Sequence, residues 1–462
     1  MKAFINIILV SFFAFLQSSC IDSLLDKKPE SEYSTENFYT TPAQIKSALM
    51  GCYSQLQSAM KTNFAYWGEG RADNVKIKHT GETAFLHNNN LDASLSSADW
   101  TALYTLISRA NYVIKYIPNV FSHADVEGQR YMAEAKALRA LAYFYLVRVW
   151  GNVPLITEPY TTVDNSVFVT RTDKETVLDF IEEELKYSVT YCKAELGGDN
   201  NRIMFTQGAA NALLVQIYMW RKNYDEAIKA ADLVLGNKLY SLVSTMEDWS
   251  VMFSNGYSSE SIFEIAYSDD QTNSLRVLYA LGNDAQYTPS ANFVASFESG
   301  DLRKEYIFNV TQAEPTMVWK FFGKDFNDES ADKSKQNIIL MRLADIMLLQ
   351  AEALNKKGGT DNVNAALKLL DPIRKRAGLD PLTETKAVNL YGSVEAAILH
   401  ERSIELCFEG HRWFDLVRTN KAILTMKPIN NLNDEKNLVW PIATTSLNKN
   451  PHLEQNEYYK NK

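Results

Sequence analysis

The chain has 462 residues, of which 46% are apolar and 22% are charged, so it can bury a large core and is not a disordered acidic tail. Glycine (19 residues) and proline (12 residues) are scarce, which argues against a loop-rich all-β fold and favours helices. The net charge is -9 and there is no basic run, which excludes binding to a nucleic-acid backbone. Length alone suggests about three domains, although helical repeats often form one longer body.

The N-terminal segment predicts export and membrane anchoring. Lys2 is followed by an apolar run over residues 3–16, which is too short to span a bilayer, and then by small residues that end at Cys20. A cysteine at this place is typical of a lipobox, in which the thiol is acylated and becomes the new N-terminus. Ordinary secretion with an incidental cysteine is the alternative. We predict a lipoprotein signal peptide over residues 1–19, lipidation of Cys20 and a lipid-anchored tether over residues 20–40.

The other cysteines and the histidines offer little chemistry. An odd number of cysteines without C-x-x-C spacing predicts buried free thiols at Cys52, Cys192 and Cys407. With only six histidines in the chain, we expect no metal site and no cofactor. No later stretch approaches 18 consecutive apolar residues, so the mature chain is expected to be anchored to a membrane without crossing it.

Helical periodicity dominates the first block of the chain. Pro42 stands at the first turn of a predicted helix, and residues 100–117 repeat apolar side chains at helical spacing. Residues 127–150 predict a further helix that stops at Gly151. Small residues four positions apart on this helix favour close packing against a neighbour.

The second block predicts stacked helix pairs. Residues 205–236 carry a tetratricopeptide-like pattern, and residues 338–377 predict a similar helical pair. With residues 172–192 and 394–408 they give three or four pairs, which must stack because a single pair cannot bury its apolar faces. Between them, residues 237–336 predict a loop-rich lobe with extended runs at 261–268 and 316–323. Loops on a rigid scaffold commonly carry binding residues.

Catalytic motifs are not supported. Glu401, Glu405 and Glu409 share one helix face beside arginines, which favours an ion-pair network over the two carboxylates across a cleft that a glycosidase needs. The sequence HERSI is not a zincin motif, because Ile404 replaces the second histidine. Since a nucleophile elbow, a P-loop and a dinucleotide fingerprint are also missing, we predict no catalytic residues and no metal ligands.

The predicted ligand contacts are aromatic and polar side chains in loops. Aromatic rings stack on the apolar faces of sugars, while Asn, Asp and Arg hydrogen-bond hydroxyl or peptide groups. For each such residue, packing beneath a loop is an equally common role. We predict the following ligand-binding residues: Tyr66, Trp67, Arg71, Asp73, Asn89, Tyr267, Tyr287 and Trp319.

Several segments together resemble the SusD/RagB family of outer-membrane lipoproteins of Bacteroidetes. The most characteristic are AEAKALRALAYFYLVRVWGNVPL (133–155), RLADIMLLQAEALN (342–355) and ERSIELCFEGHRWFDLVR (401–418). The resemblance implies an all-α, SusD-like domain over residues 41–462, in which four tetratricopeptide-like helix pairs pack against an irregular lobe with few short strands. The family's ligand contacts belong to variable loops, so no residue can be assigned by position.

The resemblance also implies a function. Members of the family lie on the cell surface as lipid-anchored outer-membrane proteins and bind oligosaccharides, or in some members peptides, for import through a SusC-like TonB-dependent transporter. They are not enzymes. Two alternatives stay open on the residues alone: a surface glycoside hydrolase using paired carboxylates, and a tetratricopeptide assembly factor that binds only protein. New reducing ends in a polysaccharide digest would favour the first, and tryptophan quenching by a sugar would count against the second.

Overall fold

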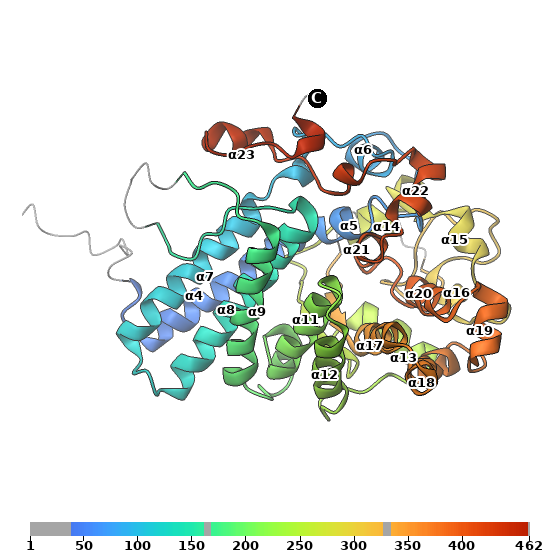
Figure 1. Ribbon diagram of the computed structural model, residues 1–462, viewed down its shortest axis with the longest axis horizontal. Coiled ribbons are helices and arrows are strands. Elements are labelled where there is room, and N and C mark those ends of the chain that lie inside the picture. The colour runs from blue at the N-terminus through green and yellow to red at the C-terminus, as the bar shows by residue number, and fades with distance from the viewer. Residues whose placement is uncertain (1–37, 161–167, 327–333, 461–462) are drawn as a thin grey trace, which may run out of the picture.

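Four long helices form a bundle at the N-terminal side of the protein (Figure 1). The structure, a computed structural model, describes residues 38–160, 168–326 and 334–460, so the predicted signal peptide, Cys20 and most of the tether lie outside the described residues. The bundle helices are α4 (Pro42–Met60), α7 (Thr101–Val120), α8 (Val126–Trp150) and α9 (Lys174–Tyr191). Helix α8 is central, because α4, α7 and α9 all pack against it and every residue from Ala137 to Trp150 is buried.

Local signals set the ends of these helices as predicted. The Thr41 side chain accepts a hydrogen bond from the backbone N–H of Gln44, and Pro42 occupies the first turn of α4, where its missing N–H costs nothing. Helix α8 ends at Gly151, whose φ of 74° lies in the left-handed region that favours glycine. The predicted helix start and stop are therefore confirmed.

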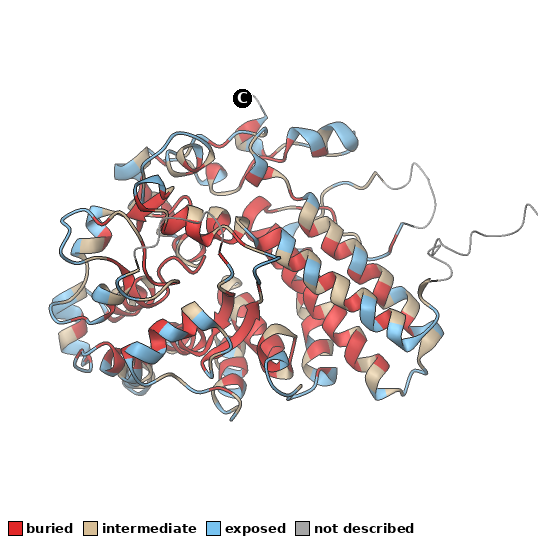
Figure 2. Ribbon diagram, turned by 180° about the vertical axis from the view of Figure 1, so that it is seen from behind, coloured by how far each residue is buried: buried red, intermediate tan, exposed pale blue. Residues whose placement is uncertain are grey.

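Three helix pairs stack in a row beyond the bundle. Helix α12 packs on α17 and α17 packs on α20, so the pairs share one continuous core (Figures 1 and 2). Figure 2 shows buried residues along the inner faces of these helices and exposed residues on their outer faces. The pairs are α11 (Gln207–Trp220) with α12 (Tyr224–Leu235), α17 (Leu343–Lys357) with α18 (Thr360–Arg376), and α19 (Glu384–Tyr391) with α20 (Val394–Glu405).

Two predicted elements differ from the structure. Residues 338–342, predicted as the start of a helix, form strand β4 (Ile338–Arg342), which pairs antiparallel with β2 (Ser261–Ile265). Both strands are buried throughout, and a short apolar run of this kind does not distinguish a buried strand from a buried helix. The run at 316–323 forms no strand; its backbone is held by hydrogen bonds such as that from Trp319 N–H to the Ile307 carbonyl at 2.6 Å.

The irregular lobe is tied to the N-terminal part of the chain. Strand β3 (Tyr287–Pro289) pairs antiparallel with β1 (Val75–Ile77), with Lys76 opposite Thr288. The lobe also contains short helices rather than loops alone. These are α13 (Met246–Asn255), α14 (Leu275–Tyr279), α15 (Ala291–Ala295) and α16 (Arg303–Ile307).

The C-terminal segment returns across the molecule and completes the N-terminal core. It contains α21 (Arg412–Arg418), α22 (Ala422–Asn430) and α23 (Thr444–Lys449), of which α22 and α23 lie toward the upper edge in Figure 1. Backbone N–H of Trp440 donates to the Val149 carbonyl at 2.8 Å, and the Trp150 indole donates to the Pro441 carbonyl at 3.0 Å. The end of α8 is therefore covered by residues nearly 300 positions later in the chain.

The cysteines lie where the sequence predicted them. Cys52, Cys192 and Cys407 are buried free thiols, and burial raises the pKa of Cys52 and of Cys407 to about 12. Within the described ranges, no helix is long and apolar enough to span a bilayer. The same ranges hold no group of three or more His, Cys, Asp or Glu side chains placed to bind a metal ion.

A buried ion-pair network joins the lobe to the last helix pairs. Glu405 accepts hydrogen bonds from Arg342 at 2.8 Å and from Arg376 at 2.5 Å, and its side chain is fully buried. The other members are also buried, and each pairs with a residue of opposite charge. They are Glu260, Asp301, Arg303, Lys320, Arg374, Glu401 and Glu409. The face of three glutamates is thus neutralised within the core, as the ion-pair interpretation predicted.

A buried carboxyl joins α5 (Asn63–Gly68) to the turn before α21. Glu69 accepts hydrogen bonds from the backbone N–H groups of Gly410 at 2.9 Å and His411 at 3.2 Å, and from Asn74 Nδ2 at 2.7 Å. Burial raises the pKa of Glu69 to about 7, although these three donors oppose the shift.

This raised pKa predicts a pH-dependent stability. Since the unfolded chain loses the Glu69 proton near pH 4.3 and the folded chain keeps it to about 7, the free energy of unfolding should fall as pH rises through that window. Below the window the contribution is fully present. Urea unfolding of wild type and Glu69→Gln at about pH 5 and about pH 8 measures it. The wild type should lose more stability than the variant between the two values, and equal losses would contradict the prediction.

Candidate functional site

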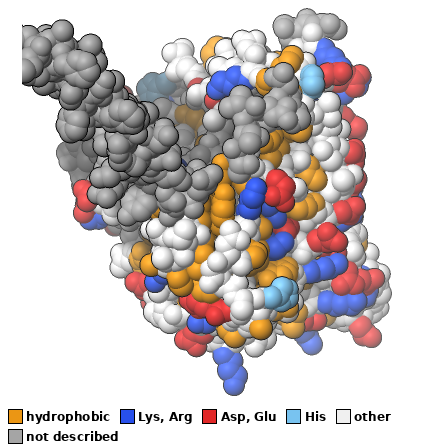
Figure 3. Space-filling view, turned by 90° about the vertical axis from the view of Figure 1, so that its left-hand side faces the viewer, with side chains coloured by type: hydrophobic (Ala, Val, Ile, Leu, Met, Phe, Trp, Pro, Cys, Tyr) orange, Lys and Arg blue, Asp and Glu red, His pale blue; other side chains and the backbone are white. Residues whose placement is uncertain are grey.

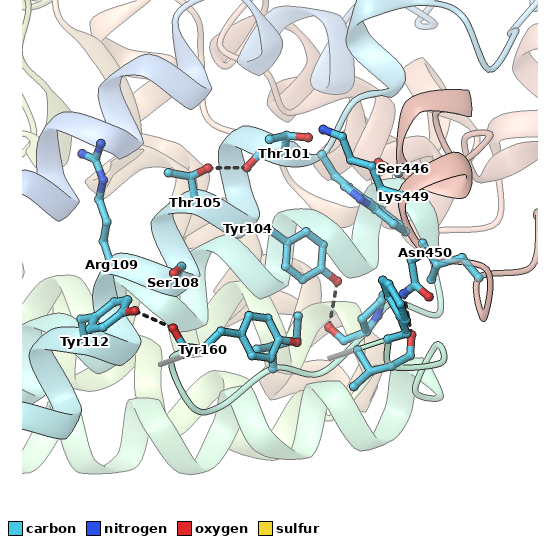
Figure 4. Close-up of a pocket in the computed structure, with 16 residues that line it drawn as sticks. Thr101, Tyr104, Thr105, Ser108, Arg109, Tyr112, Tyr160, Ser446, Lys449 and Asn450 are labelled. Carbon is cyan, nitrogen blue, oxygen red and sulfur yellow. Dashed lines mark hydrogen bonds between the residues drawn. The ribbon is translucent and has the colours of Figure 1, made fainter. Parts of the chain in front are cut away.

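A groove of about 520 Å³ follows one face of α7 and is the candidate site (Figure 4). We call it the α7 groove. The residues that α7 and its N-cap contribute recur every four positions along the helix, so they lie on one face. They form a row about 18 Å long at 1.5 Å per residue. This row combines aromatic rings with hydroxyl groups and consists of Trp100, Thr101, Tyr104, Thr105, Ser108, Arg109 and Tyr112.

Two distant segments supply the facing wall. Tyr104 donates its hydroxyl hydrogen to the Pro154 carbonyl at 2.8 Å, and Tyr112 donates to the Tyr160 carbonyl at 2.7 Å. Asn450 Nδ2 donates to the Val169 carbonyl at 3.0 Å, which fixes the C-terminal segment against the segment that follows α8. The wall residues are Pro154, Ile156, Tyr160, Phe168 and Val169 from the segment after α8, and Ser446, Lys449, Asn450 and Leu453 from α23 and beyond.

The groove presents rings whose polar ends are already bonded. Burial raises the pKa of Tyr104 well above its ordinary value, so its hydroxyl stays a protonated donor to Pro154. Tyr160 is 46% exposed, and the space-filling view of this side shows hydrophobic side chains gathered beside charged ones (Figure 3). A wall of ring faces with hydroxyl and amide groups between them suits a ligand that is apolar on one face and rich in hydroxyls at its edges.

The described chain begins beside this groove. The ring of Tyr39 stacks on Tyr116 at 4.8 Å and on Tyr112 at 5.9 Å between centroids, with interplanar angles of 7° and 6°. Tyr112 in turn holds the Tyr160 carbonyl. The three parallel tyrosines therefore fix the start of the folded body next to the groove wall.

The structure does not gather the eight predicted ligand residues into one open site. Trp67 and Tyr287 are fully buried, and Trp319 and Tyr267 are 7% and 9% exposed. Trp67 lies in α5, donates from Nε1 to the Ser97 carbonyl at 2.9 Å and packs edge-on against Trp150. The expectation that these four rings lie in exposed loops is wrong, because helix, strand and core contacts cover the faces that a sugar would need.

The polar members of the predicted set hold distant segments together. Arg71 is 1% exposed and donates to Asn89 Oδ1 at 2.6 Å and to the Asn437 carbonyl at 2.6 Å, with its guanidinium 4.2 Å from the Trp413 ring centroid. Asp73 accepts two hydrogen bonds of 2.7 Å from Arg412. These side chains are occupied by the protein itself. Tyr66, which is half-buried, keeps its ligand-binding role as a prediction.

A second cavity, of about 220 Å³, brings together a serine, a histidine and an aspartate without catalytic geometry. Ser403 donates to the backbone carbonyl of His400 at 2.9 Å rather than to its ring. Asp415 accepts from Arg402 and Arg418, and these arginines hold its pKa well below its usual range. A nucleophile bonded to its base, which covalent catalysis requires, is therefore not formed in this cavity.

A row of tetratricopeptide-like helix pairs beside an irregular lobe defines a class of mostly helical scaffold proteins. Within it, this chain belongs to the SusD family. The model described as "SusD family" matches residues 248–459, and the model described as "Starch-binding associating with outer membrane" matches residues 23–219. The family resemblance and the fold predicted from the sequence are thus confirmed.

Known relatives match along almost the whole chain. SusD-like protein P38 of Formosa agariphila is 31% identical over 99% of this chain and 100% of its own length. A solved structure of a laminarin-binding SusD-like protein aligns with a TM-score of 0.76 and 26% identity, covering 91% of this chain and 100% of the other. A SusD homologue from Bacteroides thetaiotaomicron aligns with a TM-score of 0.76 and 25% identity, covering 90% and 98%.

Proposed function

We propose that this protein is a cell-surface lipoprotein of the outer membrane that binds oligosaccharides in the α7 groove and delivers them to a SusC-like TonB-dependent transporter. The row of rings and hydroxyls along α7 is the observation that carries the proposal. A volume of about 520 Å³ lies within the usual range for ligand sites. Membership of a family described as starch-binding, and the laminarin-binding relative, support a carbohydrate over a peptide ligand.

Removal of an exposed ring tests the groove. Tyr160→Ala should raise the Kd for an oligosaccharide about 2- to 12-fold, because one stacking contact contributes about 0.5–1.5 kcal/mol. Isothermal titration with the tightest ligand from a glycan array gives the Kd. Tyr191→Ala is the matched control, since Tyr191 is 37% exposed on α9 and lies outside the groove. Equal affinity in wild type and Tyr160→Ala would place the ligand elsewhere.

The anchor and the transporter require a separate experiment. Cys20→Ala should move the protein from the outer-membrane fraction to the soluble fraction, because the acyl chains supply the membrane affinity. Affinity purification of the wild type from detergent-solubilised outer membranes should recover a TonB-dependent barrel. Failure to recover one would contradict delivery to a transporter, and new reducing ends from a polysaccharide mixed with the pure protein would contradict a binding role.

A further inference from the structure

The α7 groove carries positive charge on a protein whose net charge is -9. Among the 16 described residues that line it there are two cations, Arg109 and Lys449, and there is no aspartate or glutamate. Asp99 and Glu454, which are each adjacent in sequence to a lining residue, do not line the groove, and neither does Glu158. The sign of the lining is therefore opposite to that of the whole chain.

Neither cation is neutralised by a described neighbour. Arg109 donates from Nη1 to the Gly51 carbonyl at 2.7 Å, and Lys449 is exposed at the end of α23. The ion pairs of the described residues include neither side chain, whereas the buried arginines of the core network each contact a carboxylate. Both side chains are thus available to an anion that enters the groove.

The two cations stand at opposite ends of the groove (Figure 4). In this view the Lys449 side chain extends toward the Thr101 end of the row, and Arg109 is eight residues further along α7 than Thr101, or about 12 Å at 1.5 Å per residue. A single small anion does not reach both ends. An oligosaccharide lying along the row of rings reaches both while its ring faces remain stacked.

We propose that the α7 groove selects oligosaccharides that carry carboxylate or sulfate groups at separated positions along the chain. The proposal rests on the oligosaccharide function proposed above and narrows it to an acidic class. Hydrogen bonds to ionised groups are about twice as strong as neutral ones, and a cleft lined by one sign of charge concentrates the opposite sign. Arg109 presents a planar fork that matches a carboxylate or sulfate, and Lys449 presents a point charge.

Three oligosaccharides of equal length test the proposal by isothermal titration: a uronate trimer, a sulfated trimer and a neutral trimer. The purified wild type should bind an acidic trimer at least tenfold more tightly than the neutral one, and added salt should reduce this preference. The better acidic arm identifies the anionic group. Lys449→Gln and Arg109→Gln should each weaken acidic binding about fivefold and so reduce the ratio of acidic to neutral affinity. Lys115→Gln, on an exposed part of α7 outside the groove, should change neither.

The outcomes separate the two levels of the proposal. Equal affinity for acidic and neutral trimers, unchanged in both variants, overturns the charge selection and leaves oligosaccharide binding intact. Tighter acidic binding that persists in Lys449→Gln and Arg109→Gln overturns the assignment to this groove. Failure of every glycan on an array to bind overturns the oligosaccharide function together with its acidic class.

Discussion

Replacing Gly68 by alanine should lower the free energy of unfolding by about 3 kcal/mol or more. An added Cβ would lie 2.0 Å from the Gly410 carbonyl oxygen and 2.5 Å from the Gly410 Cα. Both atoms belong to backbone, so the end of α5 and the turn before α21 would have to separate. That shift would also stretch the hydrogen bonds from Gly410 and His411 to the buried Glu69 carboxyl. Urea unfolding followed by circular dichroism measures the loss.

Gly51→Ala is the control for the Gly68 variant. Gly51 lies inside α4, and its added Cβ would meet nothing within 4 Å. Because alanine favours the helix over glycine, this variant should gain about 0.5–1 kcal/mol. A Gly68→Ala protein as stable as the wild type would show that the two backbone segments are not in contact.

Glu405→Gln should cost about 3–5 kcal/mol, because it leaves buried arginines without their shared counter-charge. Arg342, Arg376 and Arg303 all donate to this carboxylate. Each also pairs with another carboxylate, but the buried network loses one negative charge that all three share. The exposed pair of Glu226 with Lys229 on α12 provides the control, and Glu226→Gln should be indistinguishable from wild type in the same urea titration.

The same residue predicts how the protein responds to acid. Neighbouring arginines hold the pKa of Glu405 well below its usual range despite its burial. Its contribution is therefore present above the unfolded-state pKa of about 4.3 and is lost as pH falls toward the lower folded-state value. Wild type should lose stability more steeply than Glu405→Gln as the pH is lowered below about 4. Parallel acid titrations would contradict this assignment.

The helical framework could be predicted because its signals are local. Thr41, Pro42 and Gly151 act within one turn of the helix ends that they set, and apolar spacing marks the buried faces. Strand β4 was not predictable in this way, because its five residues are all buried, as are the first residues of α17 that follow directly, so no exposed turn marks the boundary. Its partner β2 lies some 75 positions earlier, and pairing at that distance leaves no periodic signal in the sequence.

The candidate site was harder to predict because residue type does not determine burial. Trp67 and Tyr287 have the chemistry of sugar contacts, yet Trp150 covers the first and the pairing of β3 with β1 encloses the second. The α7 side of the groove had a signal in the sequence, because Trp100 and Tyr104 are four positions apart on one helix face, with hydroxyl residues beside them. Aromatic residues at helical spacing are usually core, and the facing wall is more than 300 residues away for Asn450.

The return of the C-terminal segment makes the N-terminal bundle depend on the last residues of the chain. Trp440 and Pro441 close the end of α8, and residues 446–453 supply one wall of the groove. The N-terminal bundle precedes these residues in the chain by about 290 positions, and its core is complete only when they pack against the end of α8. A chain that stops short of residue 438 therefore leaves the indole N–H of Trp150 without its Pro441 acceptor and has no complete groove. Truncation before residue 438 should therefore lower the stability of the bundle and remove one wall of the proposed binding groove.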